Sequence, residues 1–451
     1  MEKAARAKRS TSDHGPIRPF SVSNLFELGK RFMVKKSRNR KGADDMADLD
    51  WNPEPAATPN SEHTGYRIAK ARNLRGFTQE GLALRVNVSR SLLSKVESGA
   101  KPATPSLVAA VARACAVDPA EINGQPYRGT DKNSDAVHAT IPAIRMALAY
   151  VDIAPELEAR PRTLDELRTE ITELRKLQKA ASHVRLGARL PAVLEELTVH
   201  VMESDAARAW RLLNRAQALA GSLARRLGYN DLAQVIVERT SVSAQHAEDE
   251  HLPCLVSLGR ARLLMTLGAW DVALKMIKQT ASKVDQDNPV STEVFGSLHL
   301  SAAITAARAA KAADAWEHHG TATDAAARIS PRDRRDPYGL QMNPQNAAIH
   351  GCAVAVELGD ADEAIKLDRE LNLGGRGVGG ERRAHHDLDM SRVHLWGNDH
   401  EKSLKRILHT EHIAPQMARF HPSARETVRQ LQRSYRKPPE SLRLLAGRMG
   451  I

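Results

Sequence analysis

Apolar residues recur at three- and four-residue spacing along most of the chain, which is the pattern of amphipathic helices. Nothing after residue 139 alternates between apolar and polar residues with the period of two that predicts a strand. Thr163 and Glu166 have the spacing of a capping box, so a helix is predicted to begin there. Its apolar stripe contains Leu167, Ile171, Leu174 and Leu177. We therefore predict an all-α fold.

A short motif repeats in the carboxyl-terminal half, where Gly precedes Ala by five residues. It occurs as LGYNDLA (227–233), LGAWDVA (267–273) and LGDADEA (358–364), with WGNDHEKSL (396–404) as a degenerate copy. Gly lets two antiparallel helices turn tightly, and Ala lets them approach closely. The motif resembles the tetratricopeptide pattern, and the long interval before the third copy can hold a further unit around 310–319. An ordinary helical bundle would also use such turns and contacts.

Five segments follow from these patterns and from changes in composition. They are a disordered basic extension (1–63), a compact unit of short capped helices (64–127), a linker (128–144), a longer tetratricopeptide-like helical domain (145–435) and a carboxyl-terminal tail (436–451). A chain of 451 residues is too long for one hydrophobic core, so a division into several domains is expected.

Composition supports the helical prediction and limits the cellular location. Hydrophobic residues make up 42% of the chain and aromatic residues only 4%, which argues against a sandwich or barrel. Cys115, Cys254 and Cys352 lie far apart, which fits a reducing cytoplasm better than a disulfide framework. The chain contains no run of about 18 apolar residues and no apolar signal segment, so we predict a cytoplasmic protein without membrane spans.

The net charge of +12 makes a polyanionic partner plausible. Between Gly65 and Lys101 there are eight Lys or Arg residues, and Glu80 and Glu97 are the acids. Residues 30–41 add seven basic residues and no acid. They are an arm for nucleic-acid phosphates, or a solvated tail, or the product of a start codon assigned too far upstream.

The segment TQEGLALRVNVSRSLLSKVESG (78–99) predicts two short helices joined by a turn. Thr78 and Ser89 are suited to cap the helices, and Gly99 is suited to end the second one. Asn87 fits the turn, because Asn tolerates a positive φ better than most residues. The predicted contacts between the helices come from Leu82, Ala83, Val86, Val88, Leu93 and Val96.

This packing leaves Arg90, Ser91, Ser94 and Lys95 on the outward face of the second helix. A helix with polar, acid-free residues at its amino-terminal half is suited to the DNA major groove. Arg90 can donate two hydrogen bonds to guanine, and the serines can contact bases or phosphates. Gln79 begins the preceding helix, where its amide and the free backbone N–H groups can bind a phosphate.

These residues resemble the helix-turn-helix domain of the phage-repressor-like, xenobiotic-response-element (XRE) class of transcriptional regulators. The resemblance extends to an actinobacterial subgroup that joins this domain to a tetratricopeptide-like region, through KPATP (101–105), VDPAEI (117–122), GQPY (124–127), NAAIHG (346–351), AVAVELGDADEA (353–364) and IAPQMARFHPSARETVRQL (413–431). It implies a five-helix DNA-binding domain with Ile68, Leu82, Val96 and Leu107 in its core. It also implies that DNA is faced by Gln79, Ser89, Arg90, Ser91, Ser94 and Lys95.

The sequence carries no support for catalysis, a cofactor or a metal. GRGVGG (375–380) matches the letters of a dinucleotide fingerprint, but it follows a helical stretch and lacks the βαβ context that such a site needs. The histidines form no closed set of metal ligands, and no nucleophile and base pair is apparent. We therefore predict that the chain is not an enzyme.

The predicted function is a transcriptional regulator that binds double-stranded DNA as a homodimer and senses a small molecule or peptide in its helical repeats. A dimer is expected because one such module reads few base pairs. The alternative is a protein-interaction scaffold that the helix-turn-helix domain localises to DNA.

Overall fold

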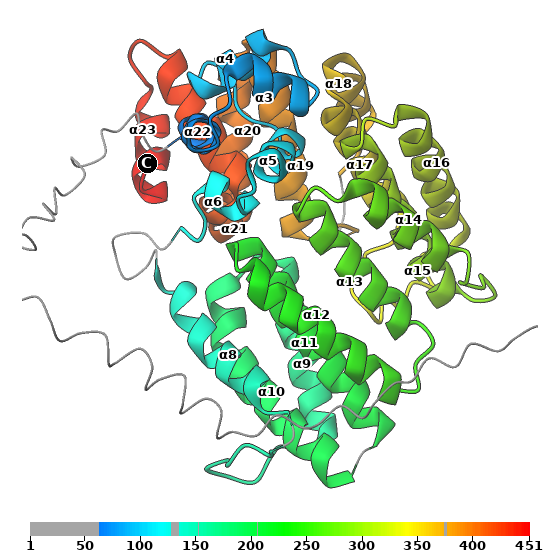
Figure 1. The fold of residues 1–451 in the computed structure, drawn as a ribbon. Coiled ribbons are helices and arrows are strands. Elements are labelled where there is room, and N and C mark those ends of the chain that lie inside the picture. The colour runs from blue at the N-terminus through cyan, green and yellow to red at the C-terminus, as the bar shows by residue number, and fades with distance from the viewer. Residues whose placement is uncertain (1–62, 128–134, 152, 205, 374–376) are drawn as a thin grey trace, which may run out of the picture. The chain divides into compact units, whose positions relative to one another are not determined.

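The chain folds into helices throughout the part that the computed structural model describes, which is residues 63–127, 135–151, 153–204, 206–373 and 377–451 (Figure 1). Within those ranges no strand is formed, which confirms the all-α prediction. Residues 1–62 of the predicted basic extension, the segment 128–134 of the linker and the first part of GRGVGG lie outside the described residues. No described helix is long and apolar enough to span a bilayer.

The amino-terminal domain has the five helices that the family resemblance implies. They are α2 (Thr64–Leu74), α3 (Gln79–Arg85), α4 (Arg90–Glu97), α5 (Pro105–Cys115) and α6 (Pro119–Asn123). Local sequence explains their ends: Thr104 and Asp118 cap α5 and α6, and each cap precedes a proline that needs no hydrogen-bond acceptor for its nitrogen.

The rest of the chain is a succession of helices, most of them paired as antiparallel hairpins. The first group is η1 (His138–Thr140), α8 (Ile141–Ala149), α9 (Leu164–Lys179), α10 (His183–Ser204), α11 (Ala207–Leu227), α12 (Asn230–His246), α13 (Leu252–Thr266) and α14 (Trp270–Ala281). The second is α15 (Pro289–Arg308), α16 (Ala312–Arg328), α17 (Pro344–Leu358), α18 (Ala361–Glu370), α19 (Gly380–Trp396), α20 (His400–Ile413), α21 (Pro415–Phe420), α22 (Pro422–Ser434) and α23 (Glu440–Met449).

The repeated Gly–Ala motif marks the turns of these hairpins, as predicted. Gly228, Gly268 and Gly359 have φ values of 88°, 76° and 80°, and the Ala residue five positions later is buried in each case. The further unit expected around 310–319 is also present, as the turn between α15 and α16, where Ala310 takes φ 57° and Ala315 is fully buried. The fold is therefore tetratricopeptide-like, with hairpins of unequal length.

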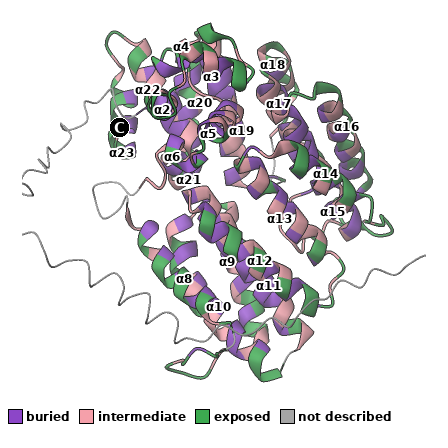
Figure 2. Cartoon of the chain, in the orientation of Figure 1, coloured by how far each residue is buried: buried purple, intermediate pink, exposed green. Residues whose placement is uncertain are grey.

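The predicted helix after Thr163 forms as α9, and both halves of its capping box are present. Leu167, Ile171 and Leu174 are buried in a core shared by α8, α10, α11 and α12. Purple buried residues alternate with green exposed ones along these helices in Figure 2, as expected for amphipathic helices that pack on one side.

The carboxyl-terminal end differs from its prediction as a tail. Residues 440–449 form α23, whose Leu442 and Leu445 are fully buried against α20 and α22. The linker is also shorter than predicted, because α8 already begins at Ile141. The sequence did carry a signal for α23, because Leu442, Leu445, Ala446 and Met449 recur at the three- and four-residue spacing of an amphipathic helix.

The helix-turn-helix domain packs on the helical region through its α5–α6 side, through the loop after α4 and through Thr64 at the start of α2. Arg113 on α5 donates to the Gly268 carbonyl at 3.0 Å, and Asn230 donates to Asp118 at 3.2 Å. Gln430 on α22 donates to the Ala100 carbonyl at 2.8 Å. These contacts leave the outward face of α4 uncovered.

Candidate nucleic-acid interface

The two helices of the predicted motif, α3 and α4, begin with the predicted caps. The Thr78 hydroxyl accepts from the Gly81 N–H at 3.0 Å, and the Ser89 hydroxyl accepts from the Leu92 N–H at 3.1 Å. Asn87 has φ 54° in the turn between them, as its residue type predicts. Gly99 follows α4 with φ 75°. Local sequence therefore determines where both helices start and stop.

The apolar side of the motif is buried in one compact core. Leu82 and Ala83 of α3 lie against Leu93 and Val96 of α4, and Ala83 leaves room for a close crossing. The family-implied core residues are all buried, and they are Ile68, Leu82, Val96 and Leu107. This packing fixes which side of α4 faces outward.

The outward face of α4 carries the candidate DNA-binding residues. Ser89, Arg90, Ser91 and Lys95 are exposed, and Ser94 is half-buried. The structure therefore brings five of the six candidates together along the first two turns of one helix. Their contacts with DNA stay a prediction.

The sixth candidate, Gln79, takes part in a network that the sequence did not reveal. Its amide nitrogen donates to the Glu97 carboxylate at 2.8 Å. Arg72 on α2 binds the same carboxylate with two N–H groups, at 2.7 and 3.0 Å, and also donates to the Phe77 carbonyl at 2.8 Å. The Glu97 side chain is only 5% exposed. One carboxylate at the end of α4 thus joins α2 and the start of α3.

This network orients Gln79 for the predicted phosphate contact without using its whole capacity. An amide nitrogen carries two N–H groups, and the bond to Glu97 occupies one of them. The other can donate to a ligand beside the free N–H groups of the first turn of α3. The stretch 65–101 contains two acids, Glu80 and Glu97, and only the fold shows that Glu97 is the buried one and that Arg72 is its partner.

Several of the eight cations counted in the sequence have structural roles. Arg67 donates to the Ile122 carbonyl at 2.7 Å, Arg75 donates to the Cys115 carbonyl at 2.6 Å, and Arg72 is paired with Glu97. Arg85 lies 4.5 Å over the Phe77 ring. Lys70, Arg90, Lys95 and Lys101 are also exposed, and so are Arg75 and Arg85 despite their contacts.

Comparison with known proteins supports the class of this domain. Residues 68–122 match the helix-turn-helix family model HTH_3, and the match includes all six candidate residues. No curated protein matches the chain. The chain is similar to a crystal structure of Bacillus thuringiensis PlcR in complex with the peptide PapR7 and DNA, with 11% identity and a TM-score of 0.31 over 75% of this chain and 98% of that chain.

The chain thus contains an XRE-type helix-turn-helix domain, the kind of DNA-binding domain found in transcriptional regulators. A tetratricopeptide-like helical region follows it. The likeness to PlcR is too distant to assign a ligand to this chain, and the relation to actinobacterial regulators stays a prediction.

Proposed function

We propose that the chain is a cytoplasmic, sequence-specific transcriptional regulator that reads the DNA major groove with α4. The observation that carries this proposal is the division of α4 into a buried apolar side and an uncovered polar side with no acid in its first two turns. A helix can enter the major groove only if such a side stands clear of the rest of the protein.

Each candidate residue has a role that its position allows. Arg90 is the first residue of α4 and can donate two hydrogen bonds to a guanine edge. Ser91 and Ser94 can reach bases or phosphates, and Lys95 can neutralise a phosphate. Gln79 and Ser89 lie at the starts of the two helices, where backbone N–H groups point outward to an anion.

The working form is a homodimer on two half-sites about one helical turn apart. One such helix contacts few base pairs, so a single copy would gain little selectivity over random DNA. Light scattering of the full chain with and without a two-site duplex tests this part, and a monomer under both conditions would contradict it.

The helical region acts as the sensor in this proposal. An effector bound there can change DNA binding only to the extent that its affinity differs between two placements of the helix-turn-helix domain. The observation that supports this role is the packing of α5 and α6 directly on the hairpin turns, through Arg113, Asp118 and their partners. The alternative is a scaffold whose helical repeats recruit a protein partner. This alternative would be favoured if the chain bound a protein partner and its thermal stability changed with no small ligand.

The experiment that tests the DNA-binding proposal compares duplexes selected from a random pool with unselected duplexes at two salt concentrations. We expect tighter binding to the selected sequences at both salts, because base contacts persist while phosphate contacts weaken. Equal affinity for both pools, with a steep salt dependence alone, would contradict sequence-specific regulation.

A further inference from the structure

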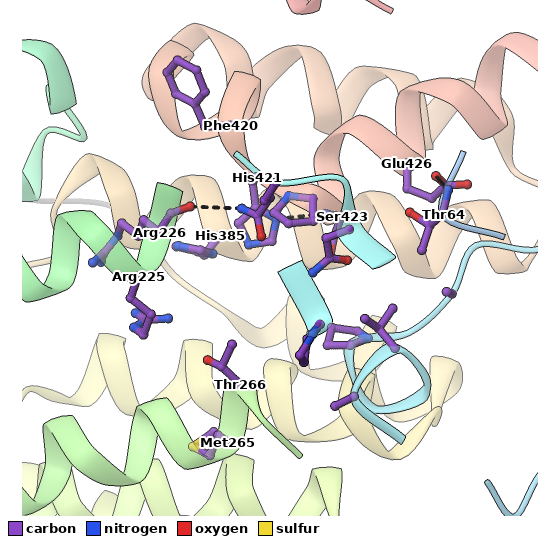
Figure 3. Close-up of a pocket in the computed structure, with 18 of the residues that line it drawn as sticks. Thr64, Arg225, Arg226, Met265, Thr266, His385, Phe420, His421, Ser423 and Glu426 are labelled. Carbon is purple, nitrogen blue, oxygen red and sulfur yellow. Dashed lines mark hydrogen bonds between the residues drawn. The ribbon is translucent and has the colours of Figure 1, made fainter. Parts of the chain in front are cut away.

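A cavity of about 210 Å³ lies between the helix-turn-helix domain and the helical region (Figure 3). One wall is formed by α5 and α6, with Pro105, Val108 and Pro119 among its residues. The opposite wall comes from the ends of α11 and α15 and from α19 and α22. Any molecule in this cavity therefore touches both parts of the chain.

The wall on the helical side is strongly basic. Arg225 and Arg226 from α11 and Arg308 from α15 line it, while Glu426 is the single acid among the lining residues. Arg226 is paired with Glu381 at 2.5 Å, and Arg308 is paired with Glu357 at 3.1 Å.

Arg225 differs from its two neighbours because it has no partner. Among the described residues, its guanidinium makes no hydrogen bond and no ion pair. The buried Nε of Arg308 also lacks a hydrogen-bond acceptor. Cations held away from bulk water are costly unless an anion pairs with them.

The charges around Arg225 strengthen this mismatch. Burial, and then the nearby cations Arg226 and Arg262, lower the pKa of Arg225 to about 9, against the weaker opposing effect of Glu381. Arg382 on α19 is a further cation in this group, and it acts on Arg262. Arg225 remains charged at neutral pH, so the cluster carries an uncompensated positive charge.

Three histidines add hydrogen-bonding groups to the same cavity, and they are His183, His385 and His421. Burial lowers the pKa of His183 to about 4 and that of His421 to about 3, so both rings are neutral at pH 7. Nδ1 of His421 accepts from the Ser423 N–H at 3.2 Å, which leaves the proton on Nε2 as a donor. Nδ1 of His183 is buried without a partner.

We infer that this cavity binds a small anion that carries a phosphate group, with Arg225 as its principal cation. Arginines and imidazoles reach the cavity from α10, α11, α15, α19 and the start of α22, so donors approach from several directions. A tetrahedral phosphate can accept hydrogen bonds from all of them, whereas a flat carboxylate accepts mainly in one plane.

The cavity has room for the proposed ligand. Its volume of about 210 Å³ is many times the roughly 10–15 Å³ that one water molecule needs, so inorganic phosphate or a short phosphomonoester fits this space. The inference rests on the proposed sensor role and specifies its ligand: binding would hold α5 and α6 against the helical region and so bias the placement of α4.

The test is calorimetric titration of the full chain with inorganic phosphate, glycerol 3-phosphate and succinate. We expect binding of at least one phosphate compound, and the comparison of the two shows whether the free ion or an ester is preferred. Binding of succinate alone, or of none of the three at concentrations up to about 10 mM, would overturn the inference.

Two variants locate the site. Arg225→Gln is expected to weaken phosphate binding at least tenfold, because the unpaired guanidinium is lost. Arg443→Gln removes an exposed arginine on α23 and is expected to leave binding unchanged. Equal binding by Arg225→Gln and the parent chain would place the phosphate elsewhere and overturn the inference.

The same variants separate ligand binding from a structural role at the end of α11. A structural Arg225 would stabilise the helix end, so Arg225→Gln would unfold at a lower temperature than the parent without phosphate. We expect instead an equal or higher midpoint without phosphate, and loss of the increase that phosphate gives the parent. If Arg225→Gln does not fold, Arg225→Lys keeps the charge, and unchanged phosphate binding by that variant would contradict a role for the guanidinium fork.

Failure of the phosphate-binding inference can be distinguished from failure of the proposed DNA-binding function. Binding of selected DNA by a chain that binds no phosphate compound would leave the DNA-binding proposal intact and remove only the ligand. If the chain binds phosphate through Arg225 but shows no DNA selectivity, the phosphate site stands and the sequence-specific DNA-binding proposal is removed.

Discussion

The substitution Glu97→Gln tests how the helix-turn-helix domain holds its two DNA-facing helices together. Glu97 is the one carboxylate shared by Arg72 of α2 and Gln79 of α3, and the Glu97 and Arg72 side chains are 5% and 13% exposed. The change keeps the shape of the side chain, removes its charge and leaves the Arg72 guanidinium without a counterion.

The magnitude follows from the contacts that remain. Removal of one partner from a buried ion pair costs about 3–5 kcal/mol. Arg72 keeps its bonds to the Phe77 carbonyl and the Asn73 side chain, and Gln at 97 can still accept one bond, so we expect a loss of about 2–4 kcal/mol in the local free energy of opening. Since 1.4 kcal/mol is a factor of ten, amide exchange should accelerate by about 30- to 700-fold.

Hydrogen–deuterium exchange of the full chain, followed by mass spectrometry, measures this effect peptide by peptide. The acceleration should appear in α2, α3 and α4 and not in α15 or α17, because opening of a local unit exposes only its own amides. Glu80→Gln is the matched control, since Glu80 is an exposed acid on α3 without a partner among the described residues. Exchange that stays within about threefold of the parent in α2–α4 of Glu97→Gln would refute the structural role of the network.

Two further predictions concern the turn and the acid response. Asn87→Val should lower the free energy of unfolding by about 1–2 kcal/mol, because a β-branched residue tolerates φ 54° poorly, while Asn87→Gly should be nearly neutral. Chemical denaturation measures both variants, and equal stability of the two would contradict this reason. Burial lowers the pKa of His421 to about 3 from its ordinary value of 6.5, so between these values the unfolded chain binds a proton that the folded chain does not. The contribution of His421 to stability is therefore fully present above pH 6.5 and is lost as the pH falls toward 3. Thermal unfolding between about pH 7.5 and about pH 5 should therefore show a falling midpoint that is less steep in His421→Gln, and equal slopes would contradict the assignment.

The parts of the fold that sequence reasoning predicted are those that depend on neighbours along the chain. Thr78, Ser89 and Thr163 cap the helices that follow them, and Asn87 takes the positive φ that its turn requires. The Gly–Ala motif predicted the hairpin turns correctly for the same reason, because a turn and the contact five residues later are properties of one short segment.

The parts that it missed depend on residues far apart in the sequence. Glu97 lies 25 positions from Arg72, and Gln430 lies 330 positions from the Ala100 carbonyl to which it donates. The cavity beside Arg225 forms only when α5 and α6 meet the ends of α11 and α15. No periodicity along the chain reports such long-range contacts, so the sequence alone does not predict the basic wall of the cavity.

The identity of α4 as the DNA-reading helix is tested most directly by the base preference of Arg90→Ala. Binding sites selected by the parent chain and by the variant from the same random pool are compared, with Arg443→Ala as the exposed control on α23. We expect the variant to lose a guanine preference at one position of each half-site, with about 1–3 kcal/mol less discrimination there, while the control selects the parent's sequence. An unchanged guanine preference in Arg90→Ala would contradict the placement of α4 in the major groove.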